Sequence, residues 1–289
     1  MSEKERGQTF LNDLAEARQD LPISAALLRD LFAQTRDDST LSLEDVGKTI
    51  SQDQTLTAKV LALANSAFYG LQAKITNVSR ATALLGLKEI RNLVISLGIM
   101  SLAKKFKLPQ KFDIQEYWRH NLATGIIAKV LALKIGSPDA QDMFTAGLLH
   151  DFGILLTAIY SPEDWKAIRR IHAKAGDMAY TQAEDQHWGI EHGLIGSMTL
   201  DAWNLPPELT EPVNWHHTPA MAPEHAQGAK IICLANGLDH LAQNPEYQLS
   251  QNARGVLAEF NLDASEILGE VDALANKESM GDFITQVAE

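Results

Sequence analysis

Residues 147–153 of this chain read GLLHDFG, and the adjacent His150 and Asp151 within this stretch determine how the rest of the sequence is interpreted. A neutral imidazole and a carboxylate are common ligands of divalent metals, and an aspartate can bridge two ions. Further histidines occur in separate segments with a helical pattern: His120, His192, His216 and His217. Five histidines and one aspartate could converge in a helical bundle. The pattern therefore indicates a metal site suited to phosphate-ester chemistry, or the remnant of one.

Helix signals dominate the sequence on both sides of this stretch. Capping-box spacings, which mark helix N-termini, occur at three places: Ser42 with Asp45, Asp113 with Glu116, and Thr181 with Glu184. Ser161, Pro162 and Glu163 predict a further helix start, and Gly176 its end. The sequence has no sustained alternation of apolar and polar residues, which would indicate a strand. The sequence therefore predicts an all-α, multi-helix bundle of about twelve to fifteen helices.

The helical pattern divides the chain into three parts. Residues 1–108 hold short predicted helices separated by polar turns and end in a lysine-rich stretch. Residues 109–242 begin with a longer predicted helix over residues 113–136 and carry all the candidate ligands. Residues 243–289 form a predicted helical tail that is rich in Asn, Gln and Ala and has no chemical motif.

The composition is that of an acidic protein able to bury a core. Hydrophobic residues make up 45% and charged residues 21% of the 289 residues. The net charge of −12 argues against nucleic acid as a partner, because a phosphate backbone would repel such a chain. The single cysteine, Cys233, lies in an apolar run and is expected to be a buried small hydrophobic residue.

The sequence shows neither a secretory signal nor a membrane helix. The N-terminal residues are charged and no apolar stretch follows them. No run reaches the roughly 20 apolar residues that a membrane helix needs. We therefore expect a cytoplasmic protein that does not associate with a membrane.

Several motifs resemble the HDOD domain, an HD-related output domain of bacterial signalling proteins. In the first half, the resemblance rests on residues 21–22 (LP), 50–53 (ISQD), 61–70 (LALANSAFYG) and 83–87 (ALLGL). In the second half, it rests on residues 118–120 (WRH), 147–153 (GLLHDFG), His192 with Gly196, 203–206 (WNLP) and 215–217 (WHH). The resemblance implies a helical fold with an additional N-terminal helical subdomain and a role in signal transduction.

The second half by itself resembles the HD superfamily of metal-dependent phosphohydrolases, whose members bind one or two ions. The resemblance implies a set of six metal ligands in this chain: His120, His150, Asp151, His192, His216 and His217. Of these, His150 and Asp151 are also the candidates for a catalytic role. The implied cofactor is one or two divalent ions, and the resemblance does not distinguish Fe, Mn, Zn and Mg.

Three departures from the superfamily pattern argue against efficient hydrolysis. The late aspartate ligand falls on Asn236, whose neutral amide is a weaker ligand, although Asp239 lies on nearly the same helix face and is an alternative. The position of a phosphate-neutralising lysine in the cyclic-dinucleotide phosphodiesterase branch is held by Ile154. Residues 218–221 (TPAM) lack the Gly-Tyr-Pro signature of that branch.

Three functions are compatible with these residues. The favoured one is a regulatory module that binds a signalling protein or a small ligand and keeps a metal site or its remnant. The second is a metal-dependent phosphohydrolase acting on a nucleotide or another phosphate ester. The third is a structural metalloprotein whose ion clamps helices together. Because the matching region and its tail account for the length of the chain, we expect it to signal through a separate partner.

The other histidines and the Asn-Ser motif have structural interpretations. We expect ordinary hydrogen-bonded histidines at three positions: His172, His225 and His240. His187 lies about 140° round a helix from His192, so we expect it to neighbour the site rather than bind the same ion. Asn65 is expected to end a helix, with a partner-binding loop as the alternative role of this stretch. Residues 65–70 are expected near the junction of the first two parts.

Overall fold

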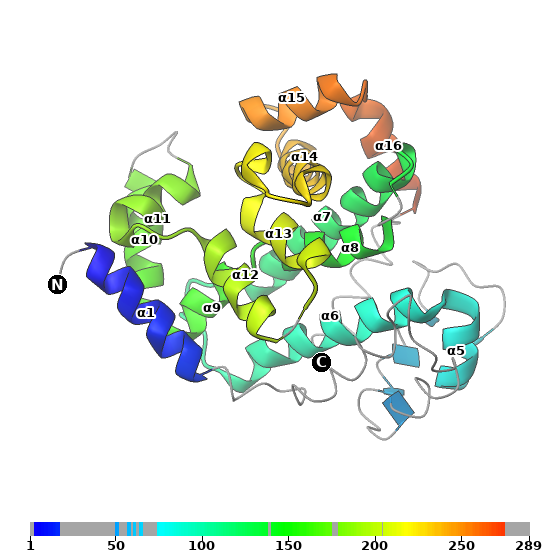
Figure 1. The fold of residues 1–289 in the computed structure, drawn as a ribbon, viewed down its shortest axis with the longest axis horizontal. Coiled ribbons are helices and arrows are strands. Elements are labelled where there is room, and N and C mark those ends of the chain that lie inside the picture. Colours follow the sequence, from blue (N-terminus) through cyan, green and yellow to red (C-terminus); the bar gives the residue numbers. More distant parts are fainter. Residues whose placement is uncertain are drawn as a thin grey trace.

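The computed structural model describes nine stretches of the chain: residues 3–17, 50–51, 57–58, 60–61, 64–65, 74–137, 140–174, 179–203 and 205–274. Within these stretches the protein forms 13 α-helices, one short 3-10 helix and no β-strand (Figure 1). The predicted all-α class is therefore confirmed. The capping box predicted at Ser42 and Asp45 lies outside the described residues, as do residues 66–70 of the Asn-Ser motif.

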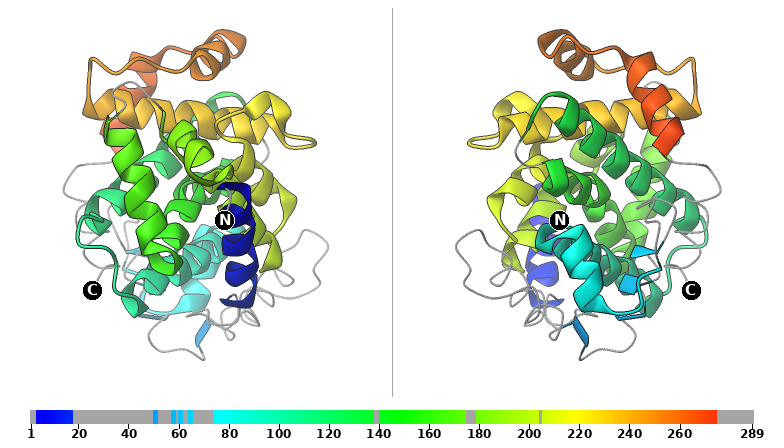
Figure 2. Two further views of the ribbon diagram at one scale, coloured as in Figure 1. Left: turned by 90° about the vertical axis from the view of Figure 1, so that its left-hand side faces the viewer. Right: turned by 90° about the vertical axis from the view of Figure 1, so that its right-hand side faces the viewer.

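The helices have the following bounds in chain order: α1 (Glu3–Ala17), α5 (Val78–Leu85), α6 (Leu87–Lys105), α7 (Ile114–Lys134), α8 (Ala140–Leu149), α9 (Phe152–Tyr160), α10 (Pro162–Lys174), α11 (Tyr180–Trp188), α12 (His192–Ala202), α13 (Pro207–Trp215), η2 (Pro219–Met221), α14 (Ala226–Gln243), α15 (Gln251–Glu259) and α16 (Ala264–Leu274). The two views in Figure 2 show α15 over α14 at one end of the molecule, with α16 beside the end of α14, and α5 and α6 at the opposite end. Helix α1 lies beside α11.

Helix α7 is the axis of this bundle. Nearly all of residues 121–132 are buried, and the helix packs against α8, α14 and α16. Its start is fixed by Asp113, whose carboxylate accepts the backbone N–H groups of Gln115 and Glu116. The helix predicted over residues 113–136 is therefore confirmed.

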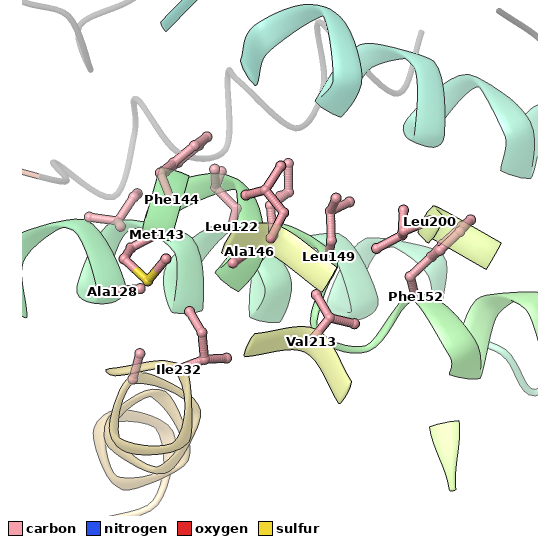
Figure 3. Packing of buried hydrophobic residues seen from close by; sticks show 14 of the residues in the cluster. Leu122, Ala128, Met143, Phe144, Ala146, Leu149, Phe152, Leu200, Val213 and Ile232 are labelled. Carbon is pink, nitrogen blue, oxygen red and sulfur yellow. The ribbon is translucent and has the colours of Figure 1, made fainter. Parts of the chain in front are cut away.

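A continuous layer of apolar side chains holds the helices that surround α7. Figure 3 shows part of it, with buried side chains contributed by α7, α8, α9, α12, α13 and α14: Leu122, Ala128, Met143, Phe144, Ala146, Leu149, Phe152, Leu200, Val213 and Ile232. Full burial of a side chain as large as Leu or Phe stabilises the fold by about 1.5–3 kcal/mol. Leu149 and Phe152 anchor the chain on the two sides of the His150-Asp151 turn.

The same turn interrupts the most apolar stretch of the chain. Residues 142–160 are long and apolar enough to cross a membrane by length and composition, but 78% of this stretch is buried inside the protein. The stretch is also divided between α8 and α9 by His150 and Asp151. It is therefore a core segment, and the described residues contain no clear membrane span. Cys233 is likewise buried, as expected.

Two ion pairs tie α6 to the histidine-bearing helices. Arg91 of α6 donates a short hydrogen bond to Asp142 of α8, and both side chains are buried. Lys129 of α7 lies 3.2 Å from Glu89 of α6. Removing one partner of a buried pair typically costs about 3–5 kcal/mol, so these contacts fix the position of α6.

Asn65 has the structural role that its place in the sequence suggests. Its amide nitrogen donates to the carbonyl oxygens of Leu61 (2.7 Å) and Ile75 (2.8 Å). Its amide oxygen accepts the backbone N–H of Ile75 at 2.7 Å. The side chain therefore joins the helical residues before it to the segment that leads into α5.

The helix starts confirm the caps predicted for α7 and α10 and correct the one predicted for α11. Helix α10 begins at Pro162, as predicted, whereas Gly176 lies outside the described residues. Helix α11 begins at Tyr180 rather than after Thr181, so the capping box predicted at Thr181 and Glu184 is wrong. The Glu184 carboxylate is instead buried and forms a hydrogen bond with the imidazole of His192, the first residue of α12.

Helices α9 and α12 approach each other so closely that only glycine fits at their crossing. A Cβ atom on Gly153 would lie 2.0 Å from the backbone oxygen of His192, far below any van der Waals contact. Gly196, on the next turn of α12, faces the backbone nitrogen of Gly153. The absent side chain at Gly153 therefore sets the distance between the Asp151 turn and the start of α12.

We expect Gly153→Ala to lower the free energy of unfolding by at least about 2 kcal/mol, because the added methyl group would push α9 away from α12. Urea denaturation followed by circular dichroism would measure the loss. Gly255→Ala in α15 is the matched control, because a Cβ atom there meets no atom within 4 Å. It should stabilise the protein by up to about 1 kcal/mol through helix propensity. Equal stability of the two variants would contradict the expected packing.

Candidate metal centre

The structure brings the six predicted ligands together in two groups of three: His120, His150 and Asp151 in one, and His192, His216 and His217 in the other. Within each group, the candidate ligand atoms all lie within 4.8 Å of one another. They come from α7, the turn between α8 and α9, the first residue of α12, and the turn that follows α13. Residues distant in sequence therefore meet at one place because the helices around α7 direct them inward.

The carboxylate of Asp151 joins the two groups. Its Oδ1 atom lies 3.2 Å from His192 Nε2 and 3.4 Å from His150 Nε2. Its Oδ2 atom lies 3.6 Å from His120 Nε2. Asp151 thus stands between the two groups, where a carboxylate can bridge two ions.

The imidazole Nε2 atoms have the mutual spacing of ligands around a common ion. His120 and His150 are 3.2 Å apart at these atoms, and His192 lies 3.3 Å from His216 and 3.1 Å from His217. Metal–nitrogen bonds of about 2.0–2.1 Å place neighbouring ligand atoms about 3.0–3.4 Å apart. The observed separations therefore fit a pair of coordination sites.

The opposite ring nitrogens determine which imidazole atom carries a hydrogen. The Nδ1 atom of His150 lies 2.7 Å from the carbonyl oxygen of Gly147, and that of His216 lies 2.8 Å from the carbonyl oxygen of Val213. A carbonyl oxygen only accepts hydrogen bonds, so both Nδ1 atoms are donors. In the neutral rings, the Nε2 lone pairs are consequently free and point into the cluster, as metal coordination requires.

Carboxylates orient two further rings in the same way. Glu184 lies 2.8 Å from His192 Nδ1 and also accepts the backbone N–H of His192. Asp239 lies 2.7 Å from His120 Nδ1. Such carboxylate–histidine pairs raise the basicity of the coordinating nitrogen and fix the plane of the ring.

The two weaker ligand candidates of α14 lie outside the cluster of ligand atoms. Asp239 supports His120 from behind, and both its oxygens bind the Arg119 guanidinium at 2.9 Å. It belongs to neither group of three and contacts the far side of the His120 ring, so its suggested role as a ligand stays a prediction. Asn236 belongs to neither group of three, and its buried Oδ1 atom has no hydrogen-bond partner among the described residues.

The charges of the cluster are unevenly distributed. Burial raises the pKa of Asp151, but His150 and His192 outweigh that effect and hold it well below its ordinary value. Burial lowers the pKa of His150 to about 4 and, together with His192, that of His217 to about 3. Burial also disfavours the charged form of His192, yet the Glu184 and Asp151 carboxylates raise its pKa to about 10. Burial likewise disfavours the charged form of His120, but the Asp239 and Asp151 carboxylates raise its pKa. In metal-free protein, positive charge is therefore favoured on His192 and His120.

Glu184 and Tyr117 were missed by sequence reasoning. Glu184 is almost fully buried, and its local spacing matched a helix cap, so its role emerges only from the way α11 meets α12. The Tyr117 hydroxyl donates to the backbone carbonyl of Asp151 at 3.3 Å and so holds the turn. The spacing of eight residues between Glu184 and His192 is the sequence signal for their pairing, whereas nothing in the local sequence marks Tyr117.

Two of the four remaining histidines, His187 and His240, lie in the surroundings of the cluster. His187 binds Asp164 at 2.8 Å and belongs to neither group of three, unlike His192. His240 stacks on the ring of His120 with a centroid separation of 4.9 Å. It thus borders the cluster instead of standing apart from it.

Comparison with known proteins matches residues 21–219 to the model of the HDOD domain. A curated relative, an uncharacterized protein of Treponema pallidum, is 27% identical over 258 residues. The match covers 88% of this chain and 49% of the relative. The chain therefore spans about half the length of that relative.

Several solved structures share the fold. An HDOD domain protein of unknown function from Geobacter sulfurreducens is 21% identical with a TM-score of 0.76, over 98% of both chains. A candidate phosphohydrolase from Shewanella amazonensis is 23% identical with a TM-score of 0.72, over 96% of this chain and 98% of that one. A candidate signal transduction protein from Marinobacter aquaeolei is 23% identical with a TM-score of 0.76, over 93% of this chain and 60% of that one. These likenesses show a common fold.

The protonation of the cluster predicts that metal-free protein is most stable near pH 6.5. Below that pH the unfolded chain takes up protons on His150 and His217, which the folded protein resists because their pKa values are about 4 and about 3. Stability therefore falls as the pH is lowered. Above that pH the folded protein keeps a proton on His192, whose pKa is about 10, while the unfolded chain releases it. Stability therefore also falls as the pH rises from about 6.5 to about 10.

Urea denaturation in EDTA at about pH 5, 6.5 and 8.5 would measure the loss of stability on both sides of the maximum. For each group, the free energy of unfolding should change by at most about 1.4 kcal/mol per pH unit. Glu184→Gln removes the main carboxylate that raises the pKa of His192, so it should reduce the loss of stability above about pH 6.5 and leave the loss below about pH 6.5 unchanged. The raised pKa of His120 accounts for the alkaline loss that remains. Constant stability of the metal-free parent from about pH 6.5 to 8.5 would contradict the assignment of the proton to His192.

Proposed function

Because this chain belongs to the HDOD domain family, we propose that it is a cytoplasmic signal-transduction module whose helical bundle holds one or two divalent ions. A single observation carries the proposal. The Nε2 atoms of His120, His150 and His192 lie within 3.6 Å of the Asp151 carboxylate, and those of His216 and His217 lie within 3.3 Å of His192 Nε2. Four of the five rings are fixed by hydrogen bonds at Nδ1. Such a donor set fits Fe, Mn or Zn better than Mg, which prefers oxygen ligands.

Each group of three would hold one ion, and Asp151 would bridge them. His120 and His150 would complete the first site, while the second would be completed by His192 and the His216-His217 turn. When bound, such ions supply Lewis-acid chemistry toward phosphate esters. The protein residues orient the ligands: Glu184 and Asp239 act through the imidazoles that they contact.

Two observations favour a regulatory role over efficient hydrolysis. The cluster is nearly closed, because the Asp151 side chain is 14% exposed and that of His120 is 11% exposed, while His150 is fully buried. The guanidinium of Arg119, next to His120 in the chain, is already paired with Asp239 and Glu116. Phosphoryl transfer depends on cationic groups that position and neutralise the phosphate, so this arrangement supports metal binding better than turnover.

The alternative function is a metal-dependent phosphohydrolase for a nucleotide or another phosphate ester. The specific observation in its favour is the convergence of all six predicted ligand residues, with the Asp151 carboxylate between the two groups of three. The fold of the candidate phosphohydrolase from Shewanella amazonensis agrees with it at the level of the fold alone.

The proposed partner is a signalling protein or a small ligand, and neither nucleic acid nor a membrane is proposed. The net charge of −12 supports the exclusion of nucleic acid. The buried position of the one strongly apolar stretch in the described residues supports the exclusion of a membrane.

We expect protein purified without added metal to contain stoichiometric Fe, Mn or Zn by inductively coupled plasma mass spectrometry. The double variant His150→Ala, Asp151→Ala should contain none, because it removes the bridge and one imidazole. Glu184→Gln should weaken metal affinity by about 10–100-fold, since it removes the carboxylate that orients His192. Glu259→Gln, which changes an exposed carboxylate on α15, is the matched control and should bind as the parent does. Equal metal content in the parent and the double variant would sink the proposal.

We expect little or no hydrolysis of cyclic dinucleotides, even by metal-loaded protein. Ile154 offers no charge beside the Asp151 turn, and Arg119 is held by two carboxylates, so the phosphate lacks a positioning cation. Turnover should be assayed by chromatography of the products with the same double variant as the control. Robust hydrolysis by the parent that disappears in the variant would favour the alternative function.

A further inference from the structure

A basic hollow lies beside α10, lined by residues that do not belong to the metal centre. It has a volume of about 530 Å³ and is bounded by one face of α10 and by the turn at residues 109–111. Its cationic lining residues are Lys111, Lys166, Arg169, Arg170 and Lys174. No Asp or Glu is among the lining residues, although acidic residues outnumber basic ones by 37 to 25 in the chain. We call this feature the α10 groove.

Most of these cations have no acidic partner within the part of the chain that the structure describes. Lys166 lies 2.6 Å from the exposed Glu163. Among the described residues, Lys111, Arg170 and Lys174 form no ion pair. Helix-dipole stabilisation accounts for a basic residue in the last turn of α10, but not for Lys111, which reaches the groove from a separate segment.

The floor of the groove is apolar and consists of packed rings. Trp165 is 2% exposed, and its ring packs against that of Phe112 with a centroid distance of 5.3 Å. Phe112 in turn packs against Tyr117 at 5.5 Å. The Arg169 guanidinium lies 5.2 Å from the centroid of the Trp165 ring, a cation–π contact that holds its plane in place. The groove is thus formed before any ligand binds.

We propose that the α10 groove binds a nucleotide, that is, a phosphorylated small molecule with a planar ring. The volume lies within the range of about 300–1,000 Å³ found for small-molecule sites. Lysine and arginine side chains are the usual protein ligands of phosphate groups. The apolar floor and the flat Arg169 guanidinium suit a ring, which free phosphate would leave uncovered. An acidic peptide would need a longer groove than one helix face and one turn provide.

Isothermal titration calorimetry at low salt, with EDTA present, tests the proposal with three probes: ADP, pyrophosphate and adenosine. ADP should bind most tightly, because it alone engages both the cations and the apolar floor. The double variant Arg170→Gln, Lys174→Gln should weaken ADP binding by about tenfold or more. Both side chains are exposed, so the fold should be retained, and an unchanged melting temperature would verify this.

Two control variants test whether ADP binds at the α10 groove itself. The double variant Lys230→Gln, Arg254→Gln removes the same charge from α14 and α15 and should bind ADP as the parent does. The metal-centre variant His150→Ala, Asp151→Ala should also keep ADP binding, so that failure of the metal proposal leaves this one intact.

Four results would overturn the nucleotide proposal. They are the absence of ADP binding, equal weakening by the two charge variants, loss of binding in the metal-centre variant, and tighter binding of a glutamate hexapeptide than of ADP. The last result would identify the groove as a site for an acidic segment of a partner protein.

Discussion

The contact between Gly153 and the backbone oxygen of His192 is the constraint on which the rest of the structure depends. No other amino acid allows α9 and α12 to cross at this separation, since a Cβ atom would lie 2.0 Å from that oxygen. The crossing brings Asp151, two residues before Gly153, within 3.2 Å of His192. Without it, the two groups of three ligands would have no shared carboxylate. Helix packing and the chemistry of the centre are therefore set by the same atoms.

The surroundings of the cluster follow from the cost of burying charge. Asp239 is compensated by Arg119, which binds both its oxygens, so it can support His120 without leaving an unpaired anion. Glu184 and Asp151 face His192 from two sides, and a positive charge there compensates both. A proton provides that charge in metal-free protein, and a bound cation would provide it in the proposed state. A proton and a metal ion would thus compete for the same imidazole ring.

The fold was predictable because its signals are local, whereas much of the site was not. Asp113 caps α7 within three residues of sequence, and helical periodicity needs no tertiary information. The six candidate ligands were recognisable from their residue types and from the family resemblance, but neither identifies the groups that orient them. The spacing of Glu184 fits a helix cap, but the crossing of α11 and α12 directs its carboxylate to His192. The metal-binding role of these ligands and the boundary at residue 108 remain predictions.

The row of rings formed by Trp165, Phe112 and Tyr117 has a thermodynamic consequence. It begins at the floor of the α10 groove and ends where the Tyr117 hydroxyl binds the carbonyl of Asp151. A ligand that shifted Trp165 would therefore change the energy of the turn that carries Asp151. Linkage between sites is reciprocal, so a metal that altered affinity in the groove would have its own affinity altered by the same factor. With positive coupling, each ligand would strengthen the binding of the other, and the bundle would respond most strongly when both were bound.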